Sequence, residues 1–310
     1  MGLSLNTAPH QRFDADLLSA SWLLRFFSVI RYRFFLYAGL LPYLLGAAWA
    51  YRTAHAFDLP VFWSGLGGVV LAVIGVEAFN EYFDSRMGTD RVFNPEELPP
   101  MTGWVFWLGV AAFAGALAAG VYLTARGGWP VLAFAFLGGM AAIFYVAPPI
   151  RWAYRGLGEA VIALSYGPWM VLGSFYLHTG TMSWGAFWAS LVPGFLIMAL
   201  AVINAIPDYH QDRLVGKRNL VVRLGRYRAV WLYIALAAAG MSVTVTGVIT
   251  GIFPLACLAA LFALPLLVLS ARHAVHTFES PRQFVPAIRS MVGVYLVAVS
   301  FFTAGILLQT

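Results

Sequence analysis

The chain is divided into long apolar runs, each about the length needed to cross a lipid bilayer. A spanning helix needs about 20 mostly apolar residues. Nine such runs follow one another: Phe34–Ala50, Val61–Asn80, Trp104–Leu123, Trp129–Ala147, Gly158–Leu177, Trp184–Asn204, Ala229–Ile249, Phe253–Ser270 and Ala287–Leu308. Because irregular backbone cannot satisfy its hydrogen bonds in hydrocarbon, the runs predict an all-α, polytopic membrane protein with nine transmembrane helices.

The composition agrees with a chain whose main solvent is lipid. Of its 310 residues, 61% are hydrophobic and 10% are charged, whereas soluble domains are about a quarter charged. We therefore expect one transmembrane domain over residues 1–310, with residues 1–32 as an N-terminal interfacial segment. The stretch Leu17–Arg33 is either an amphipathic helix in the membrane interface or an extension of the first span.

Lysine and arginine residues concentrate on one side of this predicted topology. All 19 of them except Arg52 and Arg126 fall on the side of the N-terminus when the loops are numbered along the chain. Because cytoplasmic loops carry an excess of Lys and Arg, the bias predicts a cytoplasmic N-terminus and an outer C-terminus, in the cell inner membrane. Orientation and an anionic substrate then explain the net charge of +6 better than nucleic acid does.

Acidic residues gather at the cytoplasmic end of the second predicted span. Glu77, Asn80, Glu81 and Asp84 have the i, i+3, i+4, i+7 spacing of one helix face, and Asp90 follows six residues after Asp84. Carboxylates at membrane depth are expensive and usually face a cavity or a partner. This face is therefore a candidate functional site.

A second acidic face ends the sixth predicted span. Asn204, Asp208 and Asp212 have the spacing i, i+4, i+8 of one continuous helix, which Pro207 is expected to bend. Two clusters of carboxylates repel one another unless a cation lies between them. Mg²⁺ prefers oxygen ligands and binds through carboxylates and substrate phosphates, so the pair could hold a metal-bridged diphosphate. The alternative is that the acids pair with bases of the loops, namely Arg86, Arg91, Arg213 and Lys217.

These residues resemble a known family. Residues 80–90 (NEYFDSRMGTD) and 204–213 (NAIPDYHQDR) are similar to the two aspartate-rich motifs of the UbiA superfamily of intramembrane prenyltransferases. Residues 216–225 (GKRNLVVRLG), 145–149 (YVAPP) and 154–159 (YRGLGE) add to the resemblance. It implies nine helices around a central cavity, with a cytosolic cap formed by the loops after the second and sixth helices.

The resemblance also implies an activity, which is Mg²⁺-dependent transfer of a prenyl group from its diphosphate to an acceptor, usually an aromatic ring. Carried over by position, Asn80, Asp84, Asp90, Asp208 and Asp212 would bind Mg²⁺ and diphosphate. Asn204 would support the second motif, Lys217 and Arg155 would contact phosphate together with the nearby Arg86, and Tyr145 would lie near the reacting carbon. Asp84, Asp208, Tyr145 and Glu81 are thus the expected catalytic residues, with Glu81 or Glu77 orienting an acceptor hydroxyl or taking a proton.

The spacing from Asp84 to Asp90, with Gly88 between them, resembles the 1,4-dihydroxy-2-naphthoate polyprenyltransferases of the menaquinone branch. Glu81 stands where that branch usually has Asp. The alternatives are another acceptor, such as 4-hydroxybenzoate, homogentisate, a glycerol phosphate or a haem, and, in other classes, a membrane transporter or a quinone- or lipid-binding protein. A transporter would place acids near the membrane midplane of several helices. The sequence predicts neither the prenyl length nor the oligomeric state.

Overall fold

The structure, a computed structural model, describes residues 33–87 and 103–308; of residues 33–38 and 84–87 it describes the backbone alone. Every regular element in those two ranges is helical, so the all-α prediction is confirmed there. In chain order the elements are α3 (Arg33–Ala54), α4 (Leu59–Met87), α5 (Gly103–Gly127), α6 (Trp129–Ile143), η1 (Trp152–Tyr154), α7 (Gly158–Leu164), η2 (Ser165–Trp169), α8 (Met170–Thr179), α9 (Trp184–Ala205), α10 (Tyr209–Leu214), α11 (Leu220–Leu224), α12 (Arg226–Ile249), η3 (Leu255–Ala263), α13 (Leu264–Thr277) and α14 (Pro281–Leu307).

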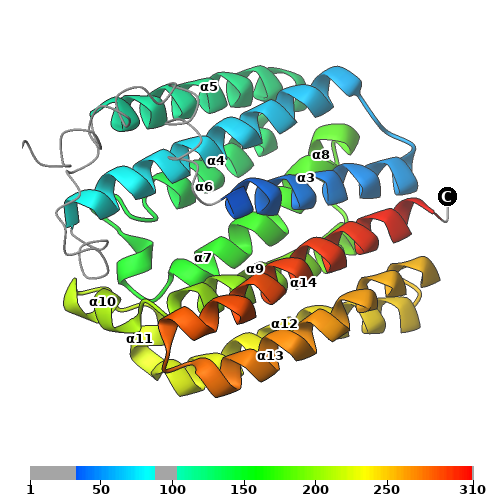
Figure 1. Cartoon of the computed structure of the whole chain (residues 1–310). Coiled ribbons are helices and arrows are strands. Elements are labelled where there is room, and N and C mark those ends of the chain that lie inside the picture. Colours follow the sequence, from blue (N-terminus) through cyan, green and yellow to red (C-terminus); the bar gives the residue numbers. More distant parts are fainter. Residues whose placement is uncertain (1–32, 88–102, 309–310) are drawn as a thin grey trace, which may run out of the picture.

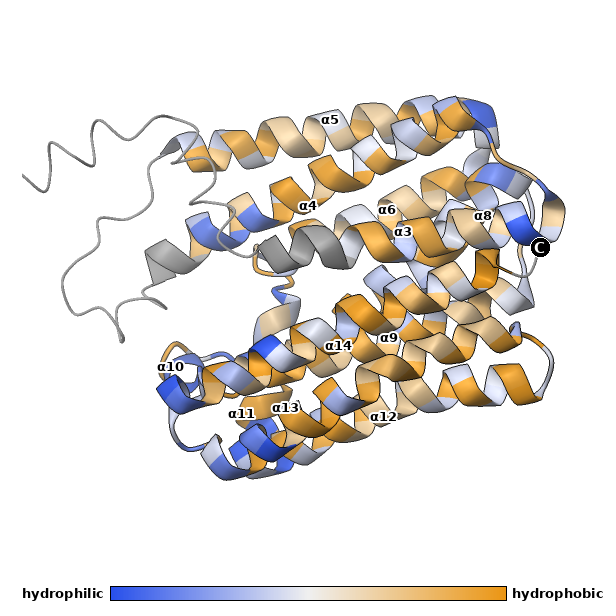
Figure 2. Ribbon diagram, turned by 45° about the vertical axis from the view of Figure 1, so that its right-hand side comes forward, coloured by the Kyte–Doolittle hydropathy of each residue, from blue (hydrophilic) through white to orange (hydrophobic). Residues whose placement is uncertain are grey.

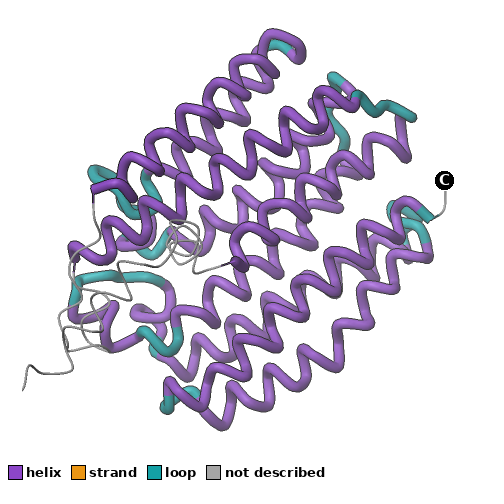
Figure 3. The backbone as a smooth tube through the Cα atoms, turned by 45° about the horizontal axis from the view of Figure 1, so that its top comes forward, coloured by secondary structure: helices purple, strands orange, loops and turns teal. Residues whose placement is uncertain are grey.

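The long helices run side by side and form a bundle, and the connections between them gather at its two ends (Figures 1 and 3). Helix α9 packs against α7, α12 and α14, α3 packs against α8 and α14, and α4 packs against α5. The short helices α10 and α11 lie at one end of the bundle (Figure 1). The same end holds the C-terminal turns of α4, while the C-terminus of α14 lies at the other.

Seven helical stretches within the described residues are long and apolar enough to cross a membrane. They are Leu59–Phe83, Gly103–Gly127, Gly158–Thr179, Trp184–Ala205, Arg226–Ile249, Leu255–Thr277 and Pro281–Leu307. The two other predicted spans correspond to α3, which is not among the seven, and to α6, which is apolar but has only 15 residues. The protein is therefore an integral membrane protein, and the count of nine spans stays a prediction.

Burial separates the helices into an inner and an outer group. In the most apolar window of α9, 67% of residues are buried inside the protein, against 17% in α5. Hydrophobic residues cover the lengths of the helices, and hydrophilic ones collect at the helix ends and over α10 (Figure 2). The exposed apolar surface of α5 is then the surface expected to face lipid, because lipid solvates apolar side chains that water does not.

The second acidic motif does not lie on one continuous helix, and that prediction is wrong. Helix α9 ends at Ala205, and α10 begins only at Tyr209. Pro207 has no N–H to donate to the carbonyl four residues earlier, and the loss of this bond favours a kink or a break in an α-helix. Shorter bonds span the break instead, from the nitrogen of Ile206 to the oxygen of Ile203 at 3.3 Å and from the nitrogen of Tyr209 to the oxygen of Ile206 at 3.4 Å. Asp208 therefore precedes α10 as its N-terminal flanking residue, and Asp212 lies within α10 and not on α9.

Candidate active site

Both acidic motifs lie at the same end of the bundle, as their place in the topology predicts (Figure 1). The described part of the first motif, residues 80–87, occupies the last turns of α4, and the second motif occupies the break after α9 together with α10. These segments are more than 100 residues apart in the sequence. The fold therefore collects the two halves of the predicted site at one end.

In the first motif, two polar residues are described within the bundle. The side chain of Glu77 is only 5% exposed. The Oδ1 atom of Asn80 is also buried, and no described group donates a hydrogen bond to it. Glu81 is half-buried, in the next position of the same helix. A buried amide oxygen without a donor is costly, so Asn80 Oδ1 fits a position that binds a cation or a donor of a ligand.

The remaining residues predicted for the first motif lie outside what the structure describes in atomic detail. The backbone of Asp84 and Arg86 belongs to α4, but their side chains are not described. Asp90 lies outside the described residues altogether. Their roles as metal and diphosphate ligands therefore stay predictions.

In the second motif, the two aspartates differ in their surroundings. Asp208 is exposed and occupies the position that caps the N-terminus of α10, and its carbonyl accepts a hydrogen bond from the nitrogen of Asp212 at 2.8 Å. Asn204, in the last turn of α9, is half-buried. Asp208 thus presents a solvent-accessible carboxylate at this end of the bundle.

Asp212 is instead held by groups of the protein. Its Oδ2 accepts a hydrogen bond from Nδ2 of Asn219 at 2.6 Å, and its Oδ1 lies 3.3 Å from Nζ of Lys217. The backbone nitrogen of Lys217 donates to the carbonyl of Asp212 at 2.8 Å. For this one aspartate the pairing of an acid with a loop base, the alternative to metal binding, is what the structure shows.

A group of cationic side chains surrounds Tyr154 in the connection between α6 and α7. Nζ of Lys217 lies 5.5 Å from the centre of its ring, and the guanidinium carbon of Arg151 lies 5.6 Å from it. Both distances are within the range of cation–π attraction. Arg155, predicted to contact phosphate, is exposed next to this ring, with Nη2 donating to the carbonyl of Pro149 at 3.1 Å. The structure therefore brings Lys217 and Arg155 to the same pair of loops.

Tyr145 lies in the turn directly after α6 and packs against the main hydrophobic core. Its carbonyl accepts a hydrogen bond from the nitrogen of Ala153 at 3.0 Å. Gly158 packs closely against the tyrosine ring, since a Cβ added there would lie 3.3 Å from Cε2 of Tyr145. The ring is thus fixed in place at the motif-bearing half of the molecule.

Three residues near the site have structural roles that the sequence reasoning missed. They are Glu159, Asn219 and Arg223, each of which makes hydrogen bonds that order the loops. Glu159 carried a signal, because it is an acid placed directly at the start of an apolar run. Asn219 and Arg223 lie in the run of residues 216–225 that resembles the family, but their hydrogen-bond partners depend on how the loops fold.

The described residues fit a Mg²⁺ ion in part. Asn80 offers a buried oxygen that lacks a donor, and Asp208 offers an exposed carboxylate; oxygen atoms of this kind are what Mg²⁺ binds. Within the described residues no group of three or more His, Cys, Asp or Glu side chains is clustered tightly enough to hold an ion. Each carboxylate oxygen of Asp212 contacts one partner and has a further lone pair through which it could bind an ion.

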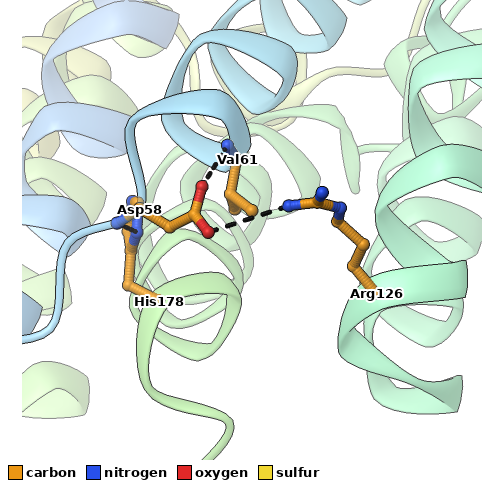
Figure 4. Close-up of polar contacts among 4 residues, drawn as sticks. All are labelled: Asp58, Val61, Arg126 and His178. Carbon is orange, nitrogen blue, oxygen red and sulfur yellow. Dashed lines mark hydrogen bonds and ion pairs between the residues drawn. The ribbon is translucent and has the colours of Figure 1, made fainter.

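A cavity of about 340 Å³ lies at the opposite end of the bundle from these motifs. It is lined by a polar group that joins the ends of α4, α5 and α8 (Figure 4). Asp58 accepts a hydrogen bond from the nitrogen of Val61 at 2.9 Å, and its carboxylate lies 3.7 Å from Nη1 of Arg126. The nitrogen of Asp58 donates to Nδ1 of His178 at 3.3 Å. These contacts tie three helix ends together, so we interpret the group as structural.

Comparison with known proteins decides what kind of protein has this arrangement. Residues 39–306 match the UbiA prenyltransferase family. The chain belongs to the UbiA prenyltransferase family. The resemblance inferred from the two aspartate-rich motifs is thereby confirmed, and this UbiA family member is an enzyme of the prenyltransferase class.

Relatives of this UbiA family member include proteins of the naphthoate branch. It is 30% identical over 268 residues to 1,4-dihydroxy-2-naphthoate octaprenyltransferase of Mycobacterium tuberculosis, covering 80% of this chain and 86% of that protein. It is 28% identical over 222 residues to the enzyme of the same name from Bacillus subtilis, covering 69% of this chain and 70% of that one. The predicted placement in the menaquinone branch is supported by these relatives.

Solved structures share the fold at low sequence identity. The apo structure of a UbiA homolog from Aeropyrum pernix K1 has a TM-score of 0.66 and 18% identity, covering 87% of this chain and 97% of that one. A UbiA homolog from Archaeoglobus fulgidus, solved bound to DMAPP and Mg²⁺, has a TM-score of 0.54 and 16% identity, covering 89% of this chain and 99% of that one. The helical bundle of this protein is therefore the bundle of its family.

Proposed function

We propose that this protein transfers a polyprenyl group from its diphosphate to 1,4-dihydroxy-2-naphthoate, in a Mg²⁺-dependent step of menaquinone biosynthesis. The observation that carries the proposal is the pair of aspartate-rich motifs at one end of a membrane-spanning bundle of this family. The names of the relatives in Mycobacterium tuberculosis and Bacillus subtilis support the choice of acceptor. So does the spacing between Asp84 and Asp90.

In this proposal the diphosphate is held between the two motifs. Mg²⁺, when bound by Asn80, Asp84, Asp90, Asp208 and Asp212, would neutralise charge on the departing diphosphate. Lys217, Arg155 and Arg86 would donate charge-assisted hydrogen bonds to its oxygens. The cationic group around Tyr154 supports this role for Lys217, because its ammonium is already held over the tyrosine ring and 3.3 Å from Asp212 of the second motif.

The prenyl carbon develops positive charge as its bond to oxygen lengthens. The face of an aromatic ring attracts a cation, and the ring of Tyr145 is fixed at the motif-bearing half of the bundle. We propose that this ring lies beside the reacting carbon. Exclusion of water by the surrounding apolar helices would protect that carbon from hydrolysis.

The acceptor would approach from the side of α4. Glu81 is half-buried on the same helix face as Asn80, so its carboxylate can accept a hydrogen bond from a ring hydroxyl and hold the ring for attack. Glu77 lies one turn deeper in the bundle and would assist. The electron-rich ring carbon then forms the new bond to the prenyl carbon as the bond from that carbon to the diphosphate oxygen breaks and the diphosphate leaves. The ring becomes aromatic again when the attacked carbon loses its own substituent, which is either a proton taken up by Glu81 or Glu77 or the carboxyl group released as carbon dioxide.

The proposal places the reaction at the cytoplasmic face of the cell inner membrane. The excess of Lys and Arg residues on the motif side supports this orientation. The match over residues 39–306 supports a single prenyltransferase domain. The N-terminal interfacial segment, residues 1–32, lies outside the described residues, as do the cytosolic-cap residues 88–102.

The test is an acceptor screen with the purified protein in detergent. The protein is incubated with geranylgeranyl diphosphate, Mg²⁺ and one of 1,4-dihydroxy-2-naphthoate, 4-hydroxybenzoate or homogentisate, and products are identified by mass spectrometry. We expect a prenylated naphthalene product alone, and its loss with EDTA. An adduct with another acceptor would overturn the menaquinone assignment, and the absence of any Mg²⁺-dependent adduct would favour a binding or transport protein.

A further inference from the structure

Two loops at the motif-bearing end are joined by hydrogen bonds, and we call this junction the loop clamp. The first loop segment is residues 149–159, which connect α6 to α7 and include the first two residues of α7. The second is residues 212–223, which run from within α10 into α11. The nitrogen of Arg218 donates to the carbonyl of Tyr154 at 3.2 Å. This bond connects residues 64 positions apart in the sequence, so the clamp is a feature of the tertiary fold.

The guanidinium of Arg223 bridges the two loops. Its Nη2 donates to the carbonyl of Arg155 at 2.6 Å, and its Nε donates to the carbonyl of Arg218 at 2.8 Å. One acceptor belongs to each loop, so a single planar side chain fastens them together. A lysine ammonium is a compact point charge without this rigid fork, and it could not make both bonds in the same way.

Glu159 supplies a second fastening, from the buried side of the junction. Its side chain is 4% exposed, and its Oε1 accepts a hydrogen bond from the nitrogen of Leu220 at 2.9 Å. Leu220 is the first residue of α11, where backbone N–H groups have no partner within the helix. Burying a carboxyl group is costly. The hydrogen bond to the start of α11 offsets part of this cost and ties Glu159 to the second loop.

The loops approach each other so closely that one position requires glycine. Gly156 has φ of +75°, and a Cβ built on it would collide with Nε of Arg223 and would lie 2.7 Å from the carbonyl oxygen of Arg218. Both atoms belong to the clamp. The backbone of one loop is thus shaped to receive the other.

We propose that Glu159 and Arg223 are positioning residues that dock these two loops and thereby hold Lys217 and Arg155 as one preassembled site for the diphosphate of the substrate. The inference rests on the proposed function and deepens it. Arg223 donates to backbone carbonyls of both loops, so its part is to place the other two cations. Lys217 sits six residues before Arg223, paired with Asp212 and lying over Tyr154.

Preassembly has a physical benefit for binding. A ligand that meets ordered side chains does not have to immobilise them, and this ordering otherwise weakens the affinity. If the loops separate, the cations become mobile and the affinity for diphosphate falls. The affinity for an acceptor ring, which would bind beside α4, should not change.

The test compares variants of the clamp in the full-length protein in detergent. Arg223→Lys and Arg223→Ala remove the bridge, Glu159→Ala removes the buried acceptor, and Glu159→Gln keeps an oxygen for the nitrogen of Leu220. Arg228→Ala is the matched control, because Arg228 is exposed on α12 nearby and its loss removes the same charge. For each variant we would measure the amide hydrogen exchange of residues 216–223, the binding of inorganic diphosphate with Mg²⁺, and KM for each substrate.

We expect Arg223→Lys, Arg223→Ala and Glu159→Ala to exchange amides of residues 216–223 about tenfold faster and to bind Mg²⁺–diphosphate about tenfold more weakly, as loss of one or two charge-assisted hydrogen bonds implies. KM for the prenyl diphosphate should rise by a similar factor while KM for the acceptor stays within about twofold. Glu159→Gln and Arg228→Ala should behave like the wild type.

The clamp is refuted if the Arg223 and Glu159→Ala variants remain folded and bind Mg²⁺–diphosphate as tightly as the wild type, or if Arg228→Ala weakens binding equally. It is also refuted if KM rises by the same factor for both substrates. Failure of the proposed function looks different, because the wild type itself would then form no prenylated product while the exchange pattern of the clamp could still be measured.

Discussion

At the scale of single residues, the two aspartates of the second motif have different surroundings. Asp208 is exposed, whereas Asp212 is buried and bonded to Asn219 and Lys217. Sequence spacing alone treats the two residues as equivalent. Asp212 orders the loop that follows it, and we propose that Asp208 contributes mainly to ligand binding.

We therefore expect Asp208→Ala and Asp212→Ala to fail in different ways. Asp208→Ala should lower kcat/KM at least about 100-fold, since even groups that only support a metal ligand are worth 10–100-fold, and it should lower the thermal midpoint less than Asp212→Ala does, because Asp208 is exposed. Asp212→Ala should also lower the free energy of unfolding by about 1–3 kcal/mol, because it leaves the buried Asn219 amide without its acceptor. Steady-state kinetics and thermal unfolding in detergent distinguish the two. Equal thermal midpoints for Asp208→Ala and Asp212→Ala would contradict the different roles assigned to the two aspartates.

Gly156 provides a second test at this scale. Gly156→Ala should destabilise the protein by at least about 1 kcal/mol, because a residue with a Cβ is strained at positive φ and this Cβ meets the clamp. KM for the prenyl diphosphate should rise. Gly216→Ala is a matched control, since Gly216 also has positive φ, of +77°, but has open space around its Cβ position. If both variants raise KM equally, the backbone strain and not the contact is responsible.

At the scale of elements, apolar length predicted where the helices lie, and it predicted their ends less well. The run Trp184–Asn204 corresponds closely to α9, since its apolar residues are continuous and Ser183 caps its start. The end of this run lies one residue from the end of α9, but the spacing of Asn204, Asp208 and Asp212 wrongly placed them on one helix face, since the chain leaves the helix around Pro207 and begins α10 only at Tyr209. The loop clamp could not be predicted, because its bonds join residues 61 and 68 positions apart and no local periodicity encodes such pairs.

The polar group at the other end of the bundle gives a prediction about the start of α4. Asp58 both caps this helix through Val61 and pairs with Arg126. Asp58→Ala should lower the free energy of unfolding by about 1 kcal/mol, the usual loss for a helix cap. Asp58→Asn should retain most of the wild-type stability, because Asn caps a helix about as well as Asp and a half-exposed ion pair contributes little. Prenyl transfer should stay near the wild-type rate in both variants, and a large loss of activity would show that this end takes part in function.

At the scale of the whole molecule, the polar ends of the bundle separate chemistry from support. Among the described residues, the end with α10 and α11 carries the second motif and the basic residues that follow it (Figure 1). The other end carries Arg126, in the last turn of α5 (Figure 4), and Arg52, in the last turn of α3. This asymmetry was readable from the sequence, because a count of loop charges needs no tertiary contacts. The burial of α9 inside the bundle could not be predicted from the sequence, because all the spans are similarly apolar.

Cysteine labelling tests the orientation that this asymmetry predicts. The native Cys257 is buried, so a membrane-impermeant maleimide should report on a cysteine introduced elsewhere. In intact cells we expect Thr181→Cys, exposed in the turn between α8 and α9, to be labelled. Glu279→Cys, exposed at the motif-bearing end, should react only after the cells are permeabilised. The reverse pattern would place the active site outside the cytoplasm.

The most direct test of the whole mechanism asks whether the two acidic motifs bind one Mg²⁺–diphosphate together. Calorimetric titration of inorganic diphosphate with Mg²⁺ would be compared for the wild type, Asp84→Ala, Asp208→Ala and the double variant. Because groups that act as a unit are strongly non-additive, we predict that each single substitution abolishes binding as fully as the double one, and that EDTA abolishes it in the wild type. Binding that survives EDTA, or two small losses that simply add, would contradict a shared metal–diphosphate site.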